Sequence, residues 1–167
     1  MSTKTGIKLI GKYDVRCVRP DGSVRWREQV TNLIVNTGLN FLLDSGLNST
    51  EAGTIYLGLK NTGSPAAGDT MASHAGWTEN QNYDEATRPS WAQGSASSQS
   101  VTNASTVDFT IDTNSQTIAG IFTTTNNTKG GTTGTLISAV DFSSSKSADD
   151  NDVIQVTYTI SAADDGA

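Results

Sequence analysis

The sequence IKLIGKYDVRCVRPDGSVRW, residues 7–26, carries the pattern that decides the fold. In its first half, Ile7–Val18, apolar side chains alternate loosely with polar ones, which is the pattern of a half-buried β-strand. The apolar residues on the common parity are Leu9, Tyr13, Val15 and Cys17. The chain then turns at Pro20-Asp21-Gly22, because proline fixes φ at about −65° and glycine accepts the positive φ that closes a tight turn. Val24–Trp26 is therefore predicted to return antiparallel as the second strand of a hairpin.

The rest of the chain supplies more short segments in which aliphatic residues alternate with Thr, Ser or Asp. They are Thr54–Lys60, a strand pair at Val101 and Val107–Ile111 joined near Asn103–Ser105, Thr117–Thr125, Thr135–Phe142 and Val153–Ile160. The glycine-rich residues 126–134, NNTKGGTTG, suit a hairpin or a surface loop. About eight strands without regular helix–strand alternation predict an all-β protein, a jelly-roll-like antiparallel β-sandwich with one short helix.

The single helical candidate is Thr37–Ser45. Asn36 or Thr37 can cap its start, and Gly46 stands where a left-handed stop is expected. Three of its leucines, Leu39, Leu42 and Leu43, are predicted to share one face. Because a helix of about two turns is not stable alone in water, these leucines are expected to pack across an open end or a face of the sheets.

The length of 167 residues predicts one domain, residues 1–167, with residues 1–6 and 162–167 flexible or arm-like. Hydrophobic residues make up 35% of the chain and charged residues only 17%, and Ser, Thr, Asn and 16 glycines fill the difference. This composition is common in all-β extracellular and virion proteins, and it differs from the highly charged composition of disordered chains.

The formal charge of −6 argues against direct binding of nucleic acid, which needs a basic face. Basic residues are nonetheless concentrated at the start, where seven of the eleven lie within the first 27 positions. They are Lys4, Lys8, Lys12, Arg16, Arg19, Arg25 and Arg27. This asymmetry fits either an N-terminal region directed toward an acidic partner or a set of solvated strand faces.

Cys17 is the only cysteine, which excludes an internal disulfide and a thiolate metal cluster. The N-terminal MSTKTGIKLIGKY lacks the apolar core of a signal peptide, and no stretch reaches the roughly 18 apolar residues of a membrane helix. We therefore expect a soluble protein without a membrane partner.

The stretch Asp69–Trp91, DTMASHAGWTENQNYDEATRPSW, gathers large side chains in an otherwise small and polar region. Its candidate partner-binding residues are Trp77, Tyr83, Arg88 and Trp91, because Trp, Tyr and Arg dominate binding hot spots. The alternative is that Arg88 pairs with Asp84 or Glu85 and that the tryptophans cap the core of the sandwich.

Several strings in the chain resemble a family of small tailed-bacteriophage virion proteins. They are TIYLGLK, DTMASHAGWTE with Tyr83 after it, EATRPSW, STVDFTI and IAGIFTTTNNTKGGTTGTLISAVDF, and the resemblance covers roughly Thr31–Ser161. The resemblance implies a capsid cement or decoration protein of the head, whose partner is the major capsid protein and which forms a homo-oligomer. It also implies a location in the virion, with assembly in the host cytoplasm.

No motif predicts catalysis, a metal or a cofactor. His74 is the only histidine and has no nucleophile motif beside it, and the neighbouring acids Asp84 and Glu85 give no evidence of a catalytic separation. The run Asp149–Asp152 lacks the spacing of a calcium loop, and the glycines at 130, 131 and 134 lack the lysine of a phosphate loop.

The sequence thus predicts a non-enzymatic virion protein that stabilises the major capsid shell. An alternative is a receptor- or glycan-binding β-module of a tail fibre, in which Trp77, Tyr83 and Trp91 stack on sugar rings.

Overall fold

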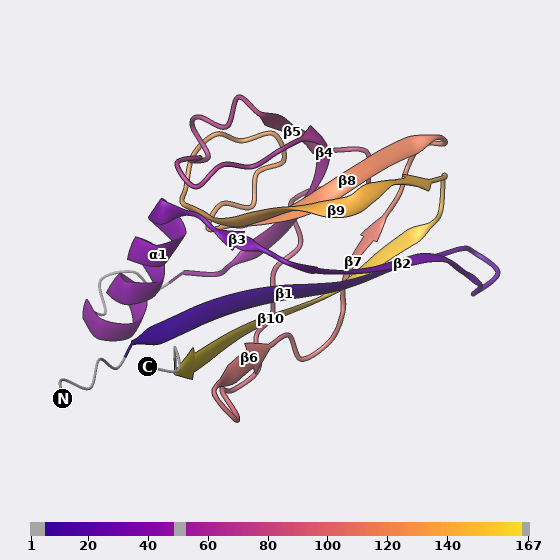
Figure 1. The fold of residues 1–167 in the computed structure, drawn as a ribbon. Helices are drawn as coiled ribbons and strands as arrows, with labels where there is room; N and C mark the ends of the chain where they lie inside the picture. Colours follow the sequence, from indigo (N-terminus) through magenta and orange to yellow (C-terminus); the bar gives the residue numbers. More distant parts are fainter. Residues whose placement is uncertain (1–5, 49–52, 165–167) are drawn as a thin grey trace.

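The computed structural model describes residues 6–48 and 53–164, which form two packed antiparallel sheets (Figure 1). Sheet A has the strand order β2-β1-β10-β6, with β7 also paired to β10, and sheet B has the order β3-β9-β8-β4-β5. Sheet A consists of β1 (Ile7–Val18), β2 (Val24–Thr31), β6 (Ser100–Thr102), β7 (Val107–Thr110) and β10 (Val153–Asp164). Sheet B consists of β3 (Leu33–Ile34), β4 (Tyr56–Gly63), β5 (Trp77–Asn80), β8 (Gln116–Thr124) and β9 (Leu136–Ala148). The predicted all-β sandwich is confirmed, whereas the jelly-roll strand order is not, because β1-β2 and β8-β9 are local hairpins within single sheets.

The N-terminal hairpin forms as predicted. β1 and β2 pair antiparallel around a turn in which Gly22 has φ of 83°, and Tyr13, Val15 and Cys17 are fully buried between the sheets. Leu9 is only half-buried, because β1 there extends past the body of the sandwich. Tyr13 also links the sheets, since its hydroxyl lies 2.9 Å from the Ser138 hydroxyl of β9.

The predicted strand pair at residues 101–111 is wrong in its pairing. β6 and β7 both pair with β10, at Thr159–Ser161 and Val153–Val156, and not with each other. The cause is Asn103, which lies between β6 and β7 and whose side-chain amide bonds the edge of β10 where a continuous strand would pair. It donates to the carbonyl of Val156 over 3.1 Å and accepts from the N–H of Tyr158 over 2.8 Å, so the chain continues along the same edge of β10.

The helix differs from its prediction at both ends. α1 (Asn36–Leu43) begins after Val35, which makes no side-chain capping bond, and Thr37 instead donates to the carbonyl of Leu136 over 2.7 Å. Gly46 does not stop the helix, because a π-helical turn, η1 (Asp44–Asn48), continues through it.

Of the three leucines predicted to pack on the sheets, only Leu42 packs against the core. Gly38 and Phe41 are buried, while Leu39 and Leu43 are 40% and 55% exposed. A Cβ on Gly38 would lie 2.0 Å from the carbonyl oxygen of Ile137, so the missing side chain lets the helix backbone rest directly on β9. This contact turns Leu39 and Leu43 outward.

Sheet B is covered on both faces. Its inner face packs on sheet A, and its outer face carries a second apolar cluster beneath the β4–β5 and β8–β9 connections (Figure 1). That cluster contains Val35, Met71, Trp77, Phe122, Leu136 and Ala139. The two covered faces explain why β8 and β9 are buried along most of their length.

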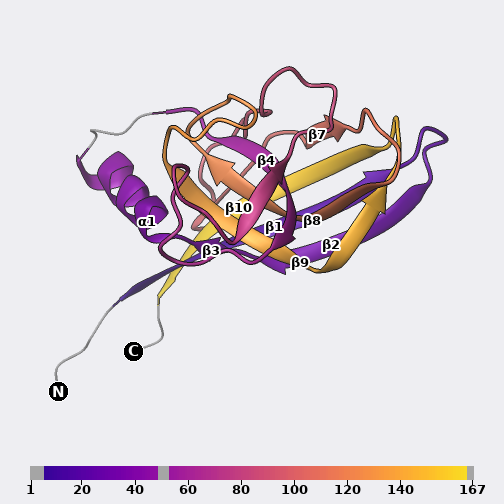
Figure 2. The same cartoon turned by 90° about the horizontal axis from the view of Figure 1, so that it is seen from above.

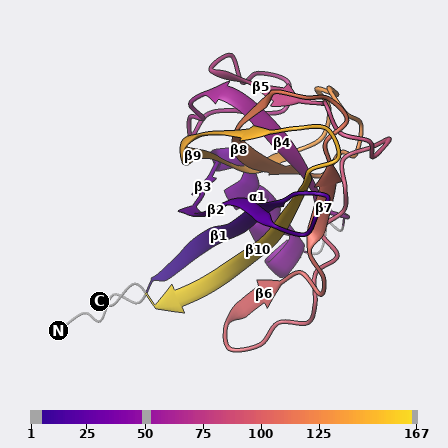
Figure 3. The same ribbon diagram turned by 90° about the vertical axis from the view of Figure 1, so that its right-hand side faces the viewer.

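A two-stranded ribbon projects from one end of the sandwich (Figure 3). It is built from the start of β1 and the end of β10, which stay in register from Ile7 opposite Asp164 to Val18 opposite Val153. α1 lies at this same end, opposite the β1–β2 turn (Figure 2). Of the predicted flexible ends, residues 162–164 belong to β10, and residues 1–5 and 165–167 lie outside the described part.

Candidate interaction surfaces

Trp91, the first of the four predicted contact residues, is 2% exposed and packs in the main core. Its indole N–H lies 3.1 Å from the carbonyl oxygen of Tyr158 and 3.3 Å from Asn103 Oδ1, and its ring lies 5.1 Å from the Tyr158 ring. Trp91 therefore holds the segment after β5 against β10.

Tyr83 is 1% exposed and meets Phe109 edge to face, with ring centroids 5.1 Å apart. The Lys129 ammonium lies 4.0 Å from the centre of its ring and donates to its backbone carbonyl over 2.6 Å. Burial raises the pKa of the Tyr83 hydroxyl above its ordinary value. Tyr83 thus closes the sandwich core beneath the β8–β9 connection.

Arg88 is 1% exposed and forms a two-pronged ion pair, with Nε and Nη2 each 2.8 Å from the carboxylate oxygens of Glu79. Its other donors reach the carbonyls of Asn126, at 2.9 Å, and Gly131, at 3.0 Å, and its guanidinium lies 5.2 Å above the Phe122 ring. The expected partners Asp84 and Glu85 do not pair with it. The pair joins β5 to the β8–β9 connection.

Trp77 is 3% exposed on the outer face of sheet B. Its indole donates to Asp69 over 2.9 Å, and His74 stacks on it with ring centroids 4.1 Å apart. His74 Nδ1 lies 3.1 Å from the Trp77 carbonyl oxygen, so the histidine is part of a local loop contact.

The structure corrects the prediction that these four residues form one partner-binding surface. They are separated between the inner core and the outer face of sheet B, and each is at most 3% exposed. Side chains buried to this degree offer almost no area to a partner. The alternative weighed for the same stretch, that the tryptophans cap the core of the sandwich, holds for Trp91, whereas Trp77 is buried in the separate cluster on the outer face of sheet B.

The acidic residues also stabilise local structure. Asp149 accepts from Arg25 over 2.6 Å, and the N–H of Ser115 together with Arg25 lowers the pKa of its carboxyl. Glu28 lies 2.7 Å from Lys146 of β9; burial opposes its ionisation, but bonds from Lys146 and Ser143 outweigh this and lower its pKa. Within residues 6–48 and 53–164, no three His, Cys, Asp or Glu side chains are placed to hold a metal ion.

The outer face of sheet A is open to solvent and basic, unlike that of sheet B. We call it the basic face and define it by its exposed cations, Lys8, Lys12, Arg16 and Arg27. Lys8, Lys12 and Arg27 form no hydrogen bond or ion pair with any described side chain, and Arg16 donates only to Gln155, over 2.8 Å.

Arg16 and Arg27 stand directly opposite each other in the β1–β2 ladder. Like charges in this position destabilise a sheet unless an anion lies between them. The two arginines border a hollow of about 300 Å³ that also has Asp14, Thr106, Gln155 and Thr157 in its walls. Asp14 is held by Gln29 over 3.0 Å, which leaves the arginine pair only partly compensated.

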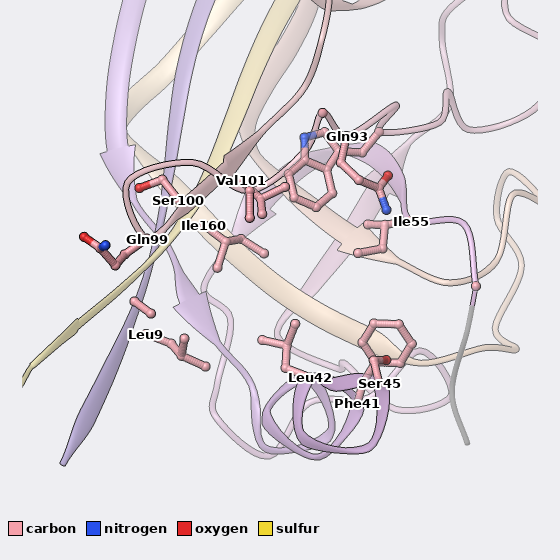
Figure 4. Close-up of a pocket in the computed structure, with 15 residues that line it drawn as sticks. Leu9, Phe41, Leu42, Ser45, Ile55, Gln93, Gln99, Ser100, Val101 and Ile160 are labelled. Carbon is pink, nitrogen blue, oxygen red and sulfur yellow. The ribbon is translucent and has the colours of Figure 1, made fainter. Parts of the chain in front are cut away.

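The second surface is an apolar groove of about 750 Å³ at the end where the ribbon projects (Figure 4). Phe41 and Leu42 of α1 line one side, and Leu9 and Ile160 of the ribbon line the other. Among the described residues that line it none is ionisable, so this lining suits apolar groups.

The surface around this groove is mainly apolar, with Lys8 and Asp44 at its border. Residues 31–43 and 89–107 contain no Asp, Glu, Lys or Arg, and four large apolar side chains are exposed nearby. These four are Ile7 (80%), Leu39 (40%), Leu43 (55%) and Leu47 (83%). We call the groove together with these side chains the apolar end. The charge-free run 89–107 was the sequence signal for it, and we did not predict this surface.

No protein-family model matches the chain, and no curated protein is similar to it in sequence. Among the described residues, no helix has the length and apolar character needed to cross a bilayer.

Proposed function

We propose that this chain is a non-enzymatic virion structural protein, a capsid cement or decoration protein that binds the major capsid protein and stabilises the shell. The observation that carries the proposal is the basic face, which no described segment covers and whose arginine pair is only partly compensated, in a chain whose formal charge is −6. A surface of opposite sign to the rest of the molecule selects one orientation of encounter with a partner.

The chemistry of the face defines the surface that it fits. Carboxylates placed between Arg16 and Arg27 would relieve the repulsion of the pair and accept charge-assisted hydrogen bonds from both guanidinium groups. The surrounding Thr and Gln side chains of the hollow offer further hydrogen bonds. The proposed partner surface on the shell is therefore acidic and nearly flat.

The identity of the partner rests on the resemblance of TIYLGLK, EATRPSW and the other quoted strings to tailed-bacteriophage virion proteins. A shell-stabilising protein needs contact area and many copies and uses no catalytic group. The proposed glycan-binding function in a tail fibre depended on exposed Trp77, Tyr83 and Trp91, and their burial leaves no observation that favours it.

The copy number per particle tests the location. Quantitative mass spectrometry of purified virions should find hundreds of copies, as on a shell. A few to tens of copies would place the protein in the tail and overturn the proposal.

Charge reversal tests the docking face. Arg27→Glu should weaken binding to shells that lack the protein, and binding of the unmodified protein should decrease as salt is added. Arg19→Glu is the matched control, because it makes the same charge change in the β1–β2 turn, where the Arg19 side chain donates to the Ser23 hydroxyl over 3.1 Å. Equal weakening by both variants would show that net charge, and not the basic face, determines binding.

A further inference from the structure

The projecting ribbon has one open strand edge, at Ile7–Ile10 of β1. On one side this stretch pairs with β10, whereas on the other side the pairing with β2 begins only further along β1. Ala162, the residue opposite Leu9, donates its N–H away from β1, to the carbonyl of Gln99 over 2.9 Å, so Leu9 and Ala162 form a non-hydrogen-bonded pair. The N–H and C=O groups of Leu9, and those of Ile7 two residues before it, therefore point to the open side, where no described strand meets them.

The opposite edge of sheet A is closed. Along the far side of β10 lie β6, the Asn103 amide and β7. Outside β7, the N–H of Asp84 donates to the carbonyl of Thr110 over 2.8 Å. An edge that is left unpaired accepts a further strand, and a two-stranded ribbon is only marginally stable in water without one. Within the described part of sheet A, the start of β1 is therefore suited to pair with a strand from another chain.

The two sides of the ribbon differ, and together they specify the strand that fits. Leu9 points into the apolar groove, and Ile7 shares its side of β1. Lys8 points to the other side, where it belongs to the basic face. Because cross-strand neighbours lie on the same side of a sheet, an added strand places two side chains beside Leu9 and Ile7 and the intervening one beside Lys8. Apolar side chains fit the first two positions, and an acidic side chain fits the third.

Lys8 also disfavours a second copy of this chain as the added strand. Two copies paired symmetrically about the centre of the open stretch would place Lys8 directly opposite Lys8, and like charges in this position destabilise a sheet. Lysines on edge strands are a common means of preventing such self-association. An acid opposite Lys8 converts the same charge into an attraction, so the charge selects a different polypeptide.

We propose that the open edge of β1 binds an extended segment of a partner protein, paired antiparallel, in which an acidic residue stands between two apolar ones. Antiparallel pairing is slightly more stable per residue than parallel pairing, and every strand pair among the described residues is antiparallel. The two apolar residues exchange backbone hydrogen bonds with Ile7 and Leu9, and the acid meets Lys8. One apolar side chain enters the groove at its Leu9 end, across from Ile55 (Figure 4).

This pairing goes beyond the proposed docking of the basic face and does not depend on it. The two surfaces are continuous, because Lys8 belongs to the basic face and its neighbours Ile7 and Leu9 form the open edge. A partner that carries such a segment can therefore contact both. Pairing over so few residues is weak for a single segment and gains strength where many copies bind together.

Titration of the full-length chain with the peptide acetyl-TVEVT-amide, followed by NMR, tests the proposal. The peptide should shift the amide signals of Ile7 and Leu9 more than those of Lys8 and Ile10, which face β10, and should slow their exchange with solvent. Acetyl-TVVET-amide has the same composition without the alternation and should bind at least about threefold more weakly. Unchanged Ile7 and Leu9 amides at millimolar peptide, or equal binding of the two peptides, would overturn the proposal.

Methylation of the peptide backbone tests the hydrogen bonds without altering the protein. In antiparallel pairing the N–H groups of the two valines point to β1, and that of the glutamate points away. N-methylation of the second valine should therefore abolish binding, whereas N-methylation of the glutamate should leave it in place. The reverse result would indicate parallel pairing and contradict the proposal.

Charge reversal tests the choice of an acidic segment. Lys8→Glu should weaken the binding of acetyl-TVEVT-amide and strengthen that of acetyl-TVKVT-amide, while Arg19→Glu, the same charge change in the β1–β2 turn, should alter neither. Equal effects of the two variants would show that net charge selects the peptide, and the proposed acid opposite Lys8 would be wrong. Arg27→Glu should bind the peptide as the unmodified chain does, so a failure of strand pairing and a failure of shell docking are distinguishable.

Discussion

The ion pair between Arg88 and Glu79 allows the sharpest prediction about stability. Both side chains are buried, at 1% and 6% exposure, and the guanidinium makes four hydrogen bonds to the carboxylate and to two loop carbonyls. Arg88→Met keeps much of the apolar stem but leaves the Glu79 carboxylate without its counter-ion. Among the described residues, the only hydrogen-bond donor left to that carboxylate would be the N–H of Gly130, which lies 2.6 Å from Glu79 Oε2 in the unmodified protein.

Breaking a buried pair by removing one partner costs about 3–5 kcal/mol, because the remaining charge is desolvated and unpaired. For a domain of this size each kcal/mol lowers the melting temperature by about 2–4 °C, so Arg88→Met should melt roughly 6–20 °C below the unmodified protein. Replacing both partners, as in Arg88→Met with Glu79→Met, removes the unpaired charge and should recover part of this loss.

Urea unfolding followed by tryptophan fluorescence measures these differences, provided that the denaturant slope is unchanged. Arg27→Ala is the control, because Arg27 is exposed and forms no ion pair with any described residue, so it should change the unfolding free energy by no more than about 0.5 kcal/mol. A loss below about 1 kcal/mol for Arg88→Met, or a double variant less stable than the single one, would refute the argument from buried charge.

Three other predictions concern packing and pH. Trp91→Ala should lower the unfolding free energy by about 3–5 kcal/mol, as truncations of buried aromatics do, and a change below about 1 kcal/mol in urea unfolding would show that the ring is not part of the core. Gly38→Ala should cost about 1–3 kcal/mol despite the better helix propensity of alanine, because the new Cβ would lie 2.0 Å from the carbonyl oxygen of Ile137. Gly46→Ala, with no atom within 4 Å, is its control and should be neutral in the same urea assay. Because the folded-state pKa of Glu28 is lowered from 4.5, its stabilisation is present above pH 4.5 and is lost as the pH falls through the lowered value. The difference in melting temperature between the unmodified protein and Glu28→Gln should therefore shrink on acidification, and a difference that grows would contradict this sign.

The strand pattern could be predicted from the sequence because it depends on local alternation. Tyr13, Val15 and Cys17 alternate with charged residues, and the structure buries those three fully. The helix was found from the same kind of pattern, but its buried face was not. A single backbone contact between Gly38 and Ile137 orients α1, and periodicity cannot reveal a contact across 99 residues of chain.

The pairing errors have the same origin. The sequence predicts a turn at Asn103. In the structure its side-chain amide instead forms hydrogen bonds with the backbone of Val156 and Tyr158 in β10, where the backbone of a neighbouring strand would otherwise pair. Arg88 was expected to pair with an acid three or four residues away, but a connection formed by residues 126–131 brings it to Glu79 instead. Such contacts become visible only when distant segments are placed together.

The covering of the two sheets explains why the large side chains of the aromatic stretch are buried. Sheet B needs a second layer, because Phe122 and Leu136 face away from sheet A, and Trp77 provides the largest part of that layer. The large side chains of the stretch are therefore required by the fold itself.

Sheet A has no such apolar outer face: Arg16 and Arg27 occupy it, and no described segment covers them. Among the described residues, the basic face and the apolar end are thus surfaces that the fold itself leaves exposed. Because these two surfaces differ in charge and in hydrophobicity, Arg27→Glu should weaken binding to shells through the basic face, whereas Leu43→Glu, which adds a charge at the apolar end, should leave that binding unchanged; equal weakening by both variants would refute docking through the basic face.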